Sequence, residues 1–388
     1  MKLRLCLLLA SVSLILVAAR VETARRPSYG GTLRAEIGAV VTSLDPAVPA
    51  ANPEEAAAKE QIDALLYASR DARGAFAGVA GSGPFRVAAW EPGKSVMLAA
   101  NEDFPGGRPF VHSVEIQMGR AARDRLLALD LNQADFAEIP PEEARAAASR
   151  GVRVSTSAPD ELVALVFAPG RPAAQDARLR EALALSIDRA AIVNFILQKT
   201  GEPAGGLLPQ WSSGSAFLFS TTADAAKAKE LASQAGGSAP IVLGYDAADA
   251  FGQAMAERIA VNAREAGITL DAQPIGRAVA EYDARLVRLR MASTKPREAL
   301  ARFVAVLNPL AGLDAATPAQ AASYEQIYAT ERAIVSSGRV IPLVWLPQVY
   351  GLSARVRDWR APAAGESWAL ADVWLEGGAA EATEKGTP

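Results

Sequence analysis

Residues 241–272 decide the fold class, and they read IVLGYDAADAFGQAMAERIAVNAREAGITLDA. Residues 241–245 and 268–272 are apolar segments of strand length. Between them an apolar side chain recurs at every fourth position: Phe251, Met255, Ile259 and Ala263. This spacing puts the four side chains on one face of a helix over residues 249–266, which stops at Gly267. A strand, a helix and a second strand of these lengths predict a βαβ unit with parallel strands and a right-handed crossover.

Outward from this unit, short strands and helices alternate along most of the chain. We expect strands over residues 32–37, 85–90, 95–99, 112–118, 135–139, 152–155, 162–167 and 340–346. We expect helices over residues 50–66, 121–131, 223–235 and 319–336, and two more that begin at the capping residues Asp176 and Asp188. The small, polar tail over residues 376–388 is expected to be disordered. The pattern is typical of an α/β protein with mixed sheets.

Length and charge limit the organisation and the partners of the chain. Its 388 residues, half of them hydrophobic when Ala is included, are too many for one ordinary core. They fit two domains or one two-lobed unit. The formal net charge of −3 leaves no large basic field, so we expect no nucleic-acid partner.

Residues 1–24 are typical of a signal peptide. After a positively charged start, the uncharged apolar run over residues 5–19 is shorter than the ~20 residues that a membrane-spanning helix needs. We expect cleavage after Ala19, with Ala24 as the alternative site and an uncleaved N-terminal anchor as the alternative interpretation. The only cysteine, Cys6, lies inside this segment, so the exported chain would contain no disulfide. The expected location is the periplasm of a Gram-negative bacterium.

Side chains that carry catalysis or hold metals are scarce. The single histidine, His112, lies beside an expected strand start, where a surface or edge role is more common than catalysis. One histidine and no cysteine in the exported chain argue against a zinc site. No Gly-x-Ser-x-Gly elbow occurs, and the Gly-rich residues 201–206 lack the Lys and Ser/Thr of a phosphate-binding loop. We therefore expect no catalytic residue, no cofactor and no metal, and a binding protein rather than an enzyme.

Tryptophan side chains are the candidates for ligand contact, because an indole combines a large apolar area with one hydrogen-bond donor. The chain has six: Trp90, Trp211, Trp345, Trp359, Trp368 and Trp374. Packing in the core is the competing interpretation for each. Trp211 lies in a Pro-, Gly- and Ser-rich loop, where burial is less natural, and Trp345 ends an apolar strand near Pro347. These two are the predicted substrate-binding residues.

Short motifs follow one another in a specific order. The first four are YGGTLR at residues 29–34, SLDP at 43–46, GSGPFRV at 81–87 and WEPG at 90–93. The next five are NEDF at 101–104, GRPF at 107–110, QADF at 133–136, DARLREAL at 176–183 and SIDR at 186–189. In this order and spacing they resemble the family 5 extracellular solute-binding proteins of ABC importers, the dipeptide- and oligopeptide-binding type. The resemblance covers residues 29–375.

This resemblance implies a two-lobed, periplasmic-binding-protein type II-like fold with mixed sheets. Lobe I would comprise residues 29–167 and 304–375, and lobe II residues 168–303. Two chain crossings, near Phe167 and Val304, would form a hinge. A solute bound between the lobes would stabilise their closed arrangement.

The sequence departs from the family pattern in two places. Between the helix that ends near Leu66 and the turn at Gly81, only residues 68–80 remain where the family carries a long part of lobe I. This predicts a truncated first lobe. Family members that read the amino terminus of a peptide use an acidic residue late in lobe II. Here residues 290–301 read RMASTKPREALA, without a matching aspartate.

The resemblance implies the periplasmic solute-binding component of an ABC importer, which captures a peptide or a similar small solute. Its partner would be an ABC permease in the inner membrane, and the chain would act as a monomer. Two alternatives stay open. A shortened, non-transport paralogue would act as an interaction or regulatory module. An enzyme on the same scaffold would show turnover that survives His112→Ala.

Overall fold

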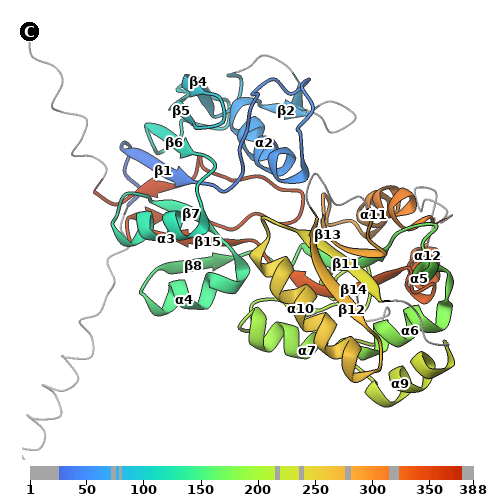
Figure 1. Cartoon of the computed structure of the whole chain (residues 1–388). Helices are drawn as coiled ribbons and strands as arrows, with labels where there is room; N and C mark the ends of the chain where they lie inside the picture. Colours follow the sequence, from blue (N-terminus) through green and yellow to red (C-terminus); the bar gives the residue numbers. More distant parts are fainter. Residues whose placement is uncertain are drawn as a thin grey trace, which may run out of the picture.

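A computed structural model describes residues 26–70, 76–77, 81–214, 219–235, 240–275, 281–313 and 323–377. The chain forms two lobes, each built on one β-sheet with helices packed against it (Figure 1). The expected signal peptide and all but the first two residues of the expected tail lie outside the described residues.

The sheet of the first lobe is mixed, and in the described residues its strand order is β4-β5-β6-β1-β7-β15-β8. Its strands are β1 (Thr32–Glu36), β4 (Phe85–Glu91), β5 (Ser95–Ala100), β6 (Ser113–Gln117), β7 (Phe136–Ile139), β8 (Arg153–Thr156) and β15 (Val349–Leu352). β1 is parallel to β6 and β7, and the other neighbours are antiparallel. Alternate residues of β1, such as Leu33 and Ala35, are buried in the core.

In the described part of the chain, the first lobe also contains helices and four very short strands. They are α2 (Pro53–Leu66), α3 (Ala122–Asp130), η1 (Pro141–Glu143), α4 (Ala144–Ser149) and the two-residue strands β2 (Ser69–Arg70), β3 (Phe76–Ala77), β16 (Val356–Arg357) and β17 (Trp374–Leu375). α2 begins at Asn52, whose side chain accepts the N–H of Glu55, and it buries Ile62 and Leu65. Between α2 and β4, the described residues contain the small ladder β2–β3.

The second sheet confirms the predicted βαβ unit. β11 (Ile241–Asp246) and β12 (Leu270–Ile275) are parallel and are joined by α10 (Ala250–Glu265). The four apolar side chains at fourfold spacing in α10 are all buried. Among the described residues the sheet has the strand order β10-β14-β9-β13-β11-β12. Its remaining strands are β9 (Glu161–Phe167), β10 (Glu202–Pro203), β13 (Ala284–Arg290) and β14 (Val340–Leu346).

Helices lie on both faces of the second sheet. They are α5 (Pro172–Gln175), α6 (Ala177–Ser186), α7 (Arg189–Ala191), η2 (Ile192–Ile196), α8 (Gln210–Ser213), α9 (Ala225–Gln234), α11 (Pro296–Ala311) and α12 (Tyr324–Ser336). Alternate residues of β9 enter two different cores: Val163 and Leu165 pack with α6 and α10, while Leu162 and Ala164 pack with α11. β9 is therefore a central strand that is buried on both faces.

The predicted helix starts at Asp176 and Asp188 are confirmed. Asp176 accepts the N–H groups of Arg178 and Leu179, and Asp188 accepts that of Ala191. The second of these helices differs from the prediction, because after the short α7 it continues as the π-helix η2.

The chain passes between the two sheets at residues 157–160 and 347–348, because β9 and β14 both pair within the second sheet. These positions differ from the crossings expected near Phe167 and Val304. β9 ends at Phe167 inside the second sheet, and Val304 lies in α11 within a core of the second lobe. Sheet membership therefore assigns the described residues between 161 and 346 to the second lobe.

Candidate functional site

The carboxyl ends of strands from both sheets point towards the two chain crossings. In the first sheet β7 ends at Ile139, and β8 ends at Thr156, next to the first crossing. In the second sheet β13 ends at Arg290, and β14 ends at Leu346, next to the second crossing. Ligands of open α/β sheets bind outside the carboxyl ends of the strands. This region, where Figure 1 shows the two lobes joined, is therefore the candidate site.

Hydrogen bonds hold the two crossings together. The backbone N–H of Ser157 donates to Gln348 O at 3.0 Å, and the N–H of Gln348 donates to Ser157 Oγ at 2.9 Å. The side-chain amide of Gln348 donates to Asp160 Oδ2. The hydroxyl of Tyr350 donates to Gln348 Oε1 at 2.6 Å, and Trp368 Nε1 donates to that hydroxyl at 3.4 Å. A polar chain thus leads from the first lobe's core to the first crossing.

Asp160 is the buried carboxylate of this chain. It is 1% exposed, and its Oδ1 has no hydrogen-bond partner in the part of the chain that the structure describes. Burial raises its pKa to about 6, against the opposing effect of the positive charge of Arg290. Its backbone oxygen accepts the N–H of Met291 at 2.8 Å, which fixes the residue after β13 to the first crossing.

Two arginines on one face of β13 stand at the carboxyl edge of the second sheet. Arg288 Nη1 lies 3.7 Å from Glu161 Oε2, and Arg290 Nη2 lies 3.9 Å from Glu161 Oε1. Arg288 Nε also lies 3.3 Å from Asp249 Oδ2. The side chains of Arg288 and Arg290 remain 35% and 43% exposed. Both guanidinium groups therefore keep access to a ligand.

Carboxylates of the first lobe act on these arginines across the lobe boundary. Burial raises the pKa of Glu142, while the charge of Arg288 partly offsets this effect. Burial alone would lower the pKa of Arg290, but the carboxylates of Glu161, Asp160 and Glu138 reverse the direction and raise it. Charges of both lobes therefore interact here. We call this group the interlobe charge cluster: Glu138, Glu142, Asp160, Glu161, Arg288 and Arg290.

The C-terminal segment of the first lobe also contacts the second lobe near this cluster. Gly365 has φ +76°, and a β-carbon at this position would overlap the carbonyl oxygen of Ala292. Only glycine allows both this backbone conformation and this close approach without strain. Next to it, Ala364 is buried in a core of the second lobe.

The structure places the two predicted binding residues differently. Trp211 is 40% exposed on α8, and its Nε1 donates to Pro159 O at 2.8 Å, so it lies beside the first crossing. Trp345 is 2% exposed, and its ring centroid lies 6.3 Å from that of Phe303. Trp345 also borders a cavity of about 110 Å³.

Sequence reasoning missed all six members of the interlobe charge cluster. They come from four separate segments that only the sheet pairing brings together. One short signal was available, since VRLR at residues 287–290 alternates apolar side chains with arginines in the manner of a strand.

The described residues also bear on metal binding and on membrane spanning. Within the described ranges, no group of three or more His, Cys, Asp and Glu side chains is arranged to hold a metal ion. His112 is exposed, in agreement with a surface role. No helix of the described part of the chain is long and apolar enough to span a membrane.

Comparison with known sequences gives a family match and several relatives. The profile of the family "Bacterial extracellular solute-binding proteins, family 5 Middle" matches residues 42–300. One relative, the "Probable D,D-dipeptide-binding periplasmic protein DdpA" of Escherichia coli, is 30% identical over 147 residues. This match spans 37% of the chain and 28% of that relative, so the chain aligns with about a quarter of the relative's length.

Solved structures with the same fold include two binding proteins. The substrate-binding protein CtaP of Listeria monocytogenes matches with a TM-score of 0.66 and 20% identity, over 76% of this chain and 66% of that one. The periplasmic binding protein DppA of Helicobacter pylori, in complex with the peptide STSA, matches with a TM-score of 0.69 and 13% identity, over 90% of this chain and 99% of that one. These likenesses establish a two-lobed fold.

Proposed function

Because the chain belongs to family 5 of the bacterial extracellular solute-binding proteins, we propose that it is the periplasmic solute-binding component of an ABC importer. It captures a peptide or a similar small solute between its two lobes. It is exported by its signal peptide, acts as a monomer and delivers the solute to a permease in the inner membrane. It is not an enzyme, and its first lobe is a shortened form of the family's.

One observation carries this proposal: the carboxyl edges of both sheets adjoin the two crossings at residues 157–160 and 347–348. Strand ends at such an edge support ligand-binding side chains, because loops leave the sheet there. Two short crossings also form a hinge, since a few residues absorb the rotation of one lobe against the other.

The interlobe charge cluster supports a zwitterionic solute such as a short peptide. Arg288 and Arg290 are partly exposed, so either guanidinium can bind a carboxylate in a bidentate manner. Glu138 and Glu142 of the first lobe supply negative charge for an ammonium group. A solute that bridges opposite charges on the two lobes favours the closed arrangement, and only this difference in affinity drives closure.

The tryptophans supply the apolar part of the proposed site. Trp211 is exposed beside the first crossing, where its ring gives a flat apolar surface for a solute. Trp345 is almost fully buried, so it does not offer an exposed ring to a solute. It forms part of the wall of the neighbouring cavity.

Native purification tests the proposal. The full chain, expressed with its leader in a Gram-negative host, is isolated from the periplasm without denaturant, and its mass is measured under native conditions. We expect a retained small molecule. After removal of that molecule by unfolding and refolding, peptides of two to five residues should raise the melting temperature, because a ligand of the folded state stabilises it.

Two outcomes would contradict the proposal. One is a protein without a retained solute whose melting temperature no peptide, sugar or opine raises. The other is a stable complex with a non-permease protein, which would favour the interaction-module alternative.

A further inference from the structure

A second cavity lies in the second lobe, away from the crossings. Its volume is about 140 Å³, while a single water needs roughly 10–15 Å³ on the same measure. It borders the start of β14, at Val340, Ile341 and Pro342. The second crossing follows the other end of β14, which is roughly 13 Å from Pro342 at 3.3 Å per residue. All residues that line this cavity belong to the second lobe, and one of them, Gly205, also lines the cavity beside Trp345, so the two cavities adjoin.

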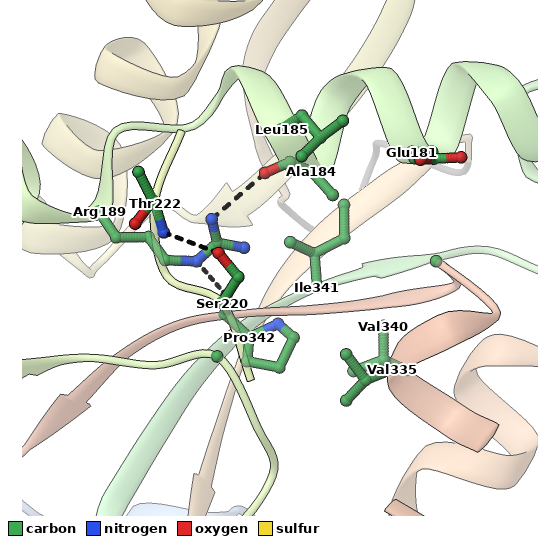
Figure 2. A pocket seen from close by; sticks show the side chains of 12 residues that line it. Glu181, Ala184, Leu185, Arg189, Ser220, Thr222, Val335, Val340, Ile341 and Pro342 are labelled. Atoms are coloured by element: carbon green, nitrogen blue, oxygen red, sulfur yellow. Dashed lines mark hydrogen bonds between the residues drawn. The ribbon is translucent and has the colours of Figure 1, made fainter. Parts of the chain in front are cut away.

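One end of this cavity holds a buried arginine without a carboxylate partner (Figure 2). Arg189 is 5% exposed, its Nε donates to Pro342 O at 2.8 Å, and its Nη1 donates to Ala184 O at 3.2 Å and Ile187 O at 3.4 Å. In the described part of the chain, its Nη2 has no hydrogen-bond partner and none of its nitrogens has an ion-pair partner. A buried cation without a counter-ion is costly, and an anion in the cavity would remove that cost.

Hydroxyl groups accompany Arg189 at this end. Ser220 and Thr222 border the cavity and are exposed. Ser220 Oγ accepts the backbone N–H of Thr222 at 3.3 Å, so its own proton remains available to a ligand oxygen. Figure 2 shows both residues on the same side of the cavity as the guanidinium group.

The rest of the cavity is apolar, apart from one acidic side chain. Val335, Val340, Ile341 and Leu185 supply aliphatic surface next to the polar end. Glu181 also borders the cavity, and Lys227 Nζ holds its carboxylate at 2.9 Å. Figure 2 places Glu181 on the side opposite Arg189, so the side of the cavity away from the guanidinium group offers no unpaired cation from these residues to a second carboxylate.

We propose that this cavity binds a small aliphatic monocarboxylate, with its carboxylate on Arg189 and Ser220 and its hydrocarbon chain on Val335 and Ile341. The single uncompensated cation selects one negative charge, and the aliphatic wall selects a hydrocarbon chain over a second carboxylate. This site is lined by residues of the second lobe alone, whereas the proposed solute site lies between the two lobes.

Calorimetric titration of the full chain tests the proposal. Sodium butyrate, acetate, succinate and inorganic phosphate are compared at pH 7 and matched ionic strength. Butyrate should bind with a dissociation constant on the order of 1 mM or tighter. Acetate and succinate should bind more weakly. Phosphate binding as tight as that of butyrate, or no butyrate binding, would overturn the assignment.

Substitutions locate the site. Arg189→Lys should weaken the affinity for butyrate about tenfold, because lysine lacks the planar guanidinium group that can donate two parallel hydrogen bonds to a carboxylate. Arg180→Lys is the matched control. Arg180 is likewise buried, at 7% exposed, and it donates to the backbone oxygens of Ser337 and Ala174, but it does not line the cavity. If Arg189→Lys fails to fold, Val335→Trp at a half-buried position fills the apolar end and should remove butyrate binding. Unchanged binding in Val335→Trp, or equal loss in Arg180→Lys, would overturn the proposal.

Discussion

The side-chain amide of Gln348 donates a hydrogen bond to the buried carboxylate of Asp160, and this bond joins the two chain crossings. Two further hydrogen bonds strengthen the same link: the backbone N–H of Ser157 donates to Gln348 O, and the backbone N–H of Gln348 donates to Ser157 Oγ. The crossings therefore form one hydrogen-bonded unit. A rotation of one lobe against the other either breaks these hydrogen bonds or proceeds while they stay intact.

Gln348→Ala should destabilise the folded chain. It leaves the buried carboxylate of Asp160 without its donor and the hydroxyl of Tyr350 without its acceptor, which costs about 1–3 kcal/mol in the free energy of unfolding. Urea denaturation measures this value. Gln273→Ala is the control, because Gln273 makes the same kind of bond to Asp271 at an exposed position and should change stability by less than about 0.5 kcal/mol. Equal effects would contradict the structural role of Gln348.

Asp160→Asn should flatten the pH dependence of stability. The pKa of Asp160 is about 6 in the folded chain, against roughly 4 when unfolded, so the folded state binds more protons in this window. The ionisation of Asp160 therefore lowers the free energy of unfolding by on the order of 3 kcal/mol as pH rises from about 4 to 6. This loss persists above pH 6. Relative to the wild type, Asp160→Asn should gain stability between pH 4.5 and 7.5, as urea denaturation at both values would record. Parallel pH profiles would contradict this prediction.

Gly365→Ala should disturb the contact between the C-terminal segment and the second lobe. The new β-carbon would overlap Ala292 O in addition to straining a backbone with φ +76°. Gly170→Ala is the matched control, because Gly170 has φ +80° and no atom near the added carbon. We expect a loss of about 1 kcal/mol for the control and at least 1 kcal/mol more for Gly365→Ala in thermal unfolding. A smaller loss in Gly365→Ala than in the control would show that the contact is not formed.

Trp211→Ala and Trp345→Ala should separate binding from stability. Trp345 is buried against Phe303, so its truncation should cost about 3–5 kcal/mol in unfolding free energy. Trp211 is 40% exposed, so Trp211→Ala should cost about 1 kcal/mol or less but weaken binding of the retained solute. Denaturation and calorimetry on both variants check these values. Unchanged solute affinity in Trp211→Ala would remove Trp211 from the site.

Much of the fold could be predicted from local patterns. The βαβ unit at residues 241–272 is confirmed because fourfold helical spacing and short apolar strands are local signals. The elements that were missed include β13, α11, α4 and β15. Arginines interrupt the apolar pattern of β13. α11 carries buried residues at helical spacing, with Leu300, Phe303 and Leu307 on one face, but it also contains Pro309, which is unusual inside a helix.

The lobe boundaries and the site depend on pairing, which the sequence does not encode locally. β9 is apolar on both faces, so its pattern indicates a central strand without indicating which sheet contains it. For the same reason Glu138 and Arg290, which are 152 positions apart, become neighbours only through the topology. The composition of the chain made the tryptophans the predicted binding residues. The interlobe charge cluster was missed because its charged side chains lie at or near the ends of strands from different parts of the chain.

A distance measurement between the lobes tests the central claim most directly. Spin labels at Leu127→Cys on α3 and Val261→Cys on α10, both at exposed positions, report the separation of the lobes in a chain that also carries Cys6→Ser. With the solute that is retained through native purification, we predict a shorter and narrower distance distribution than in the stripped protein. A bound solute that leaves the distribution unchanged would contradict capture between two closing lobes.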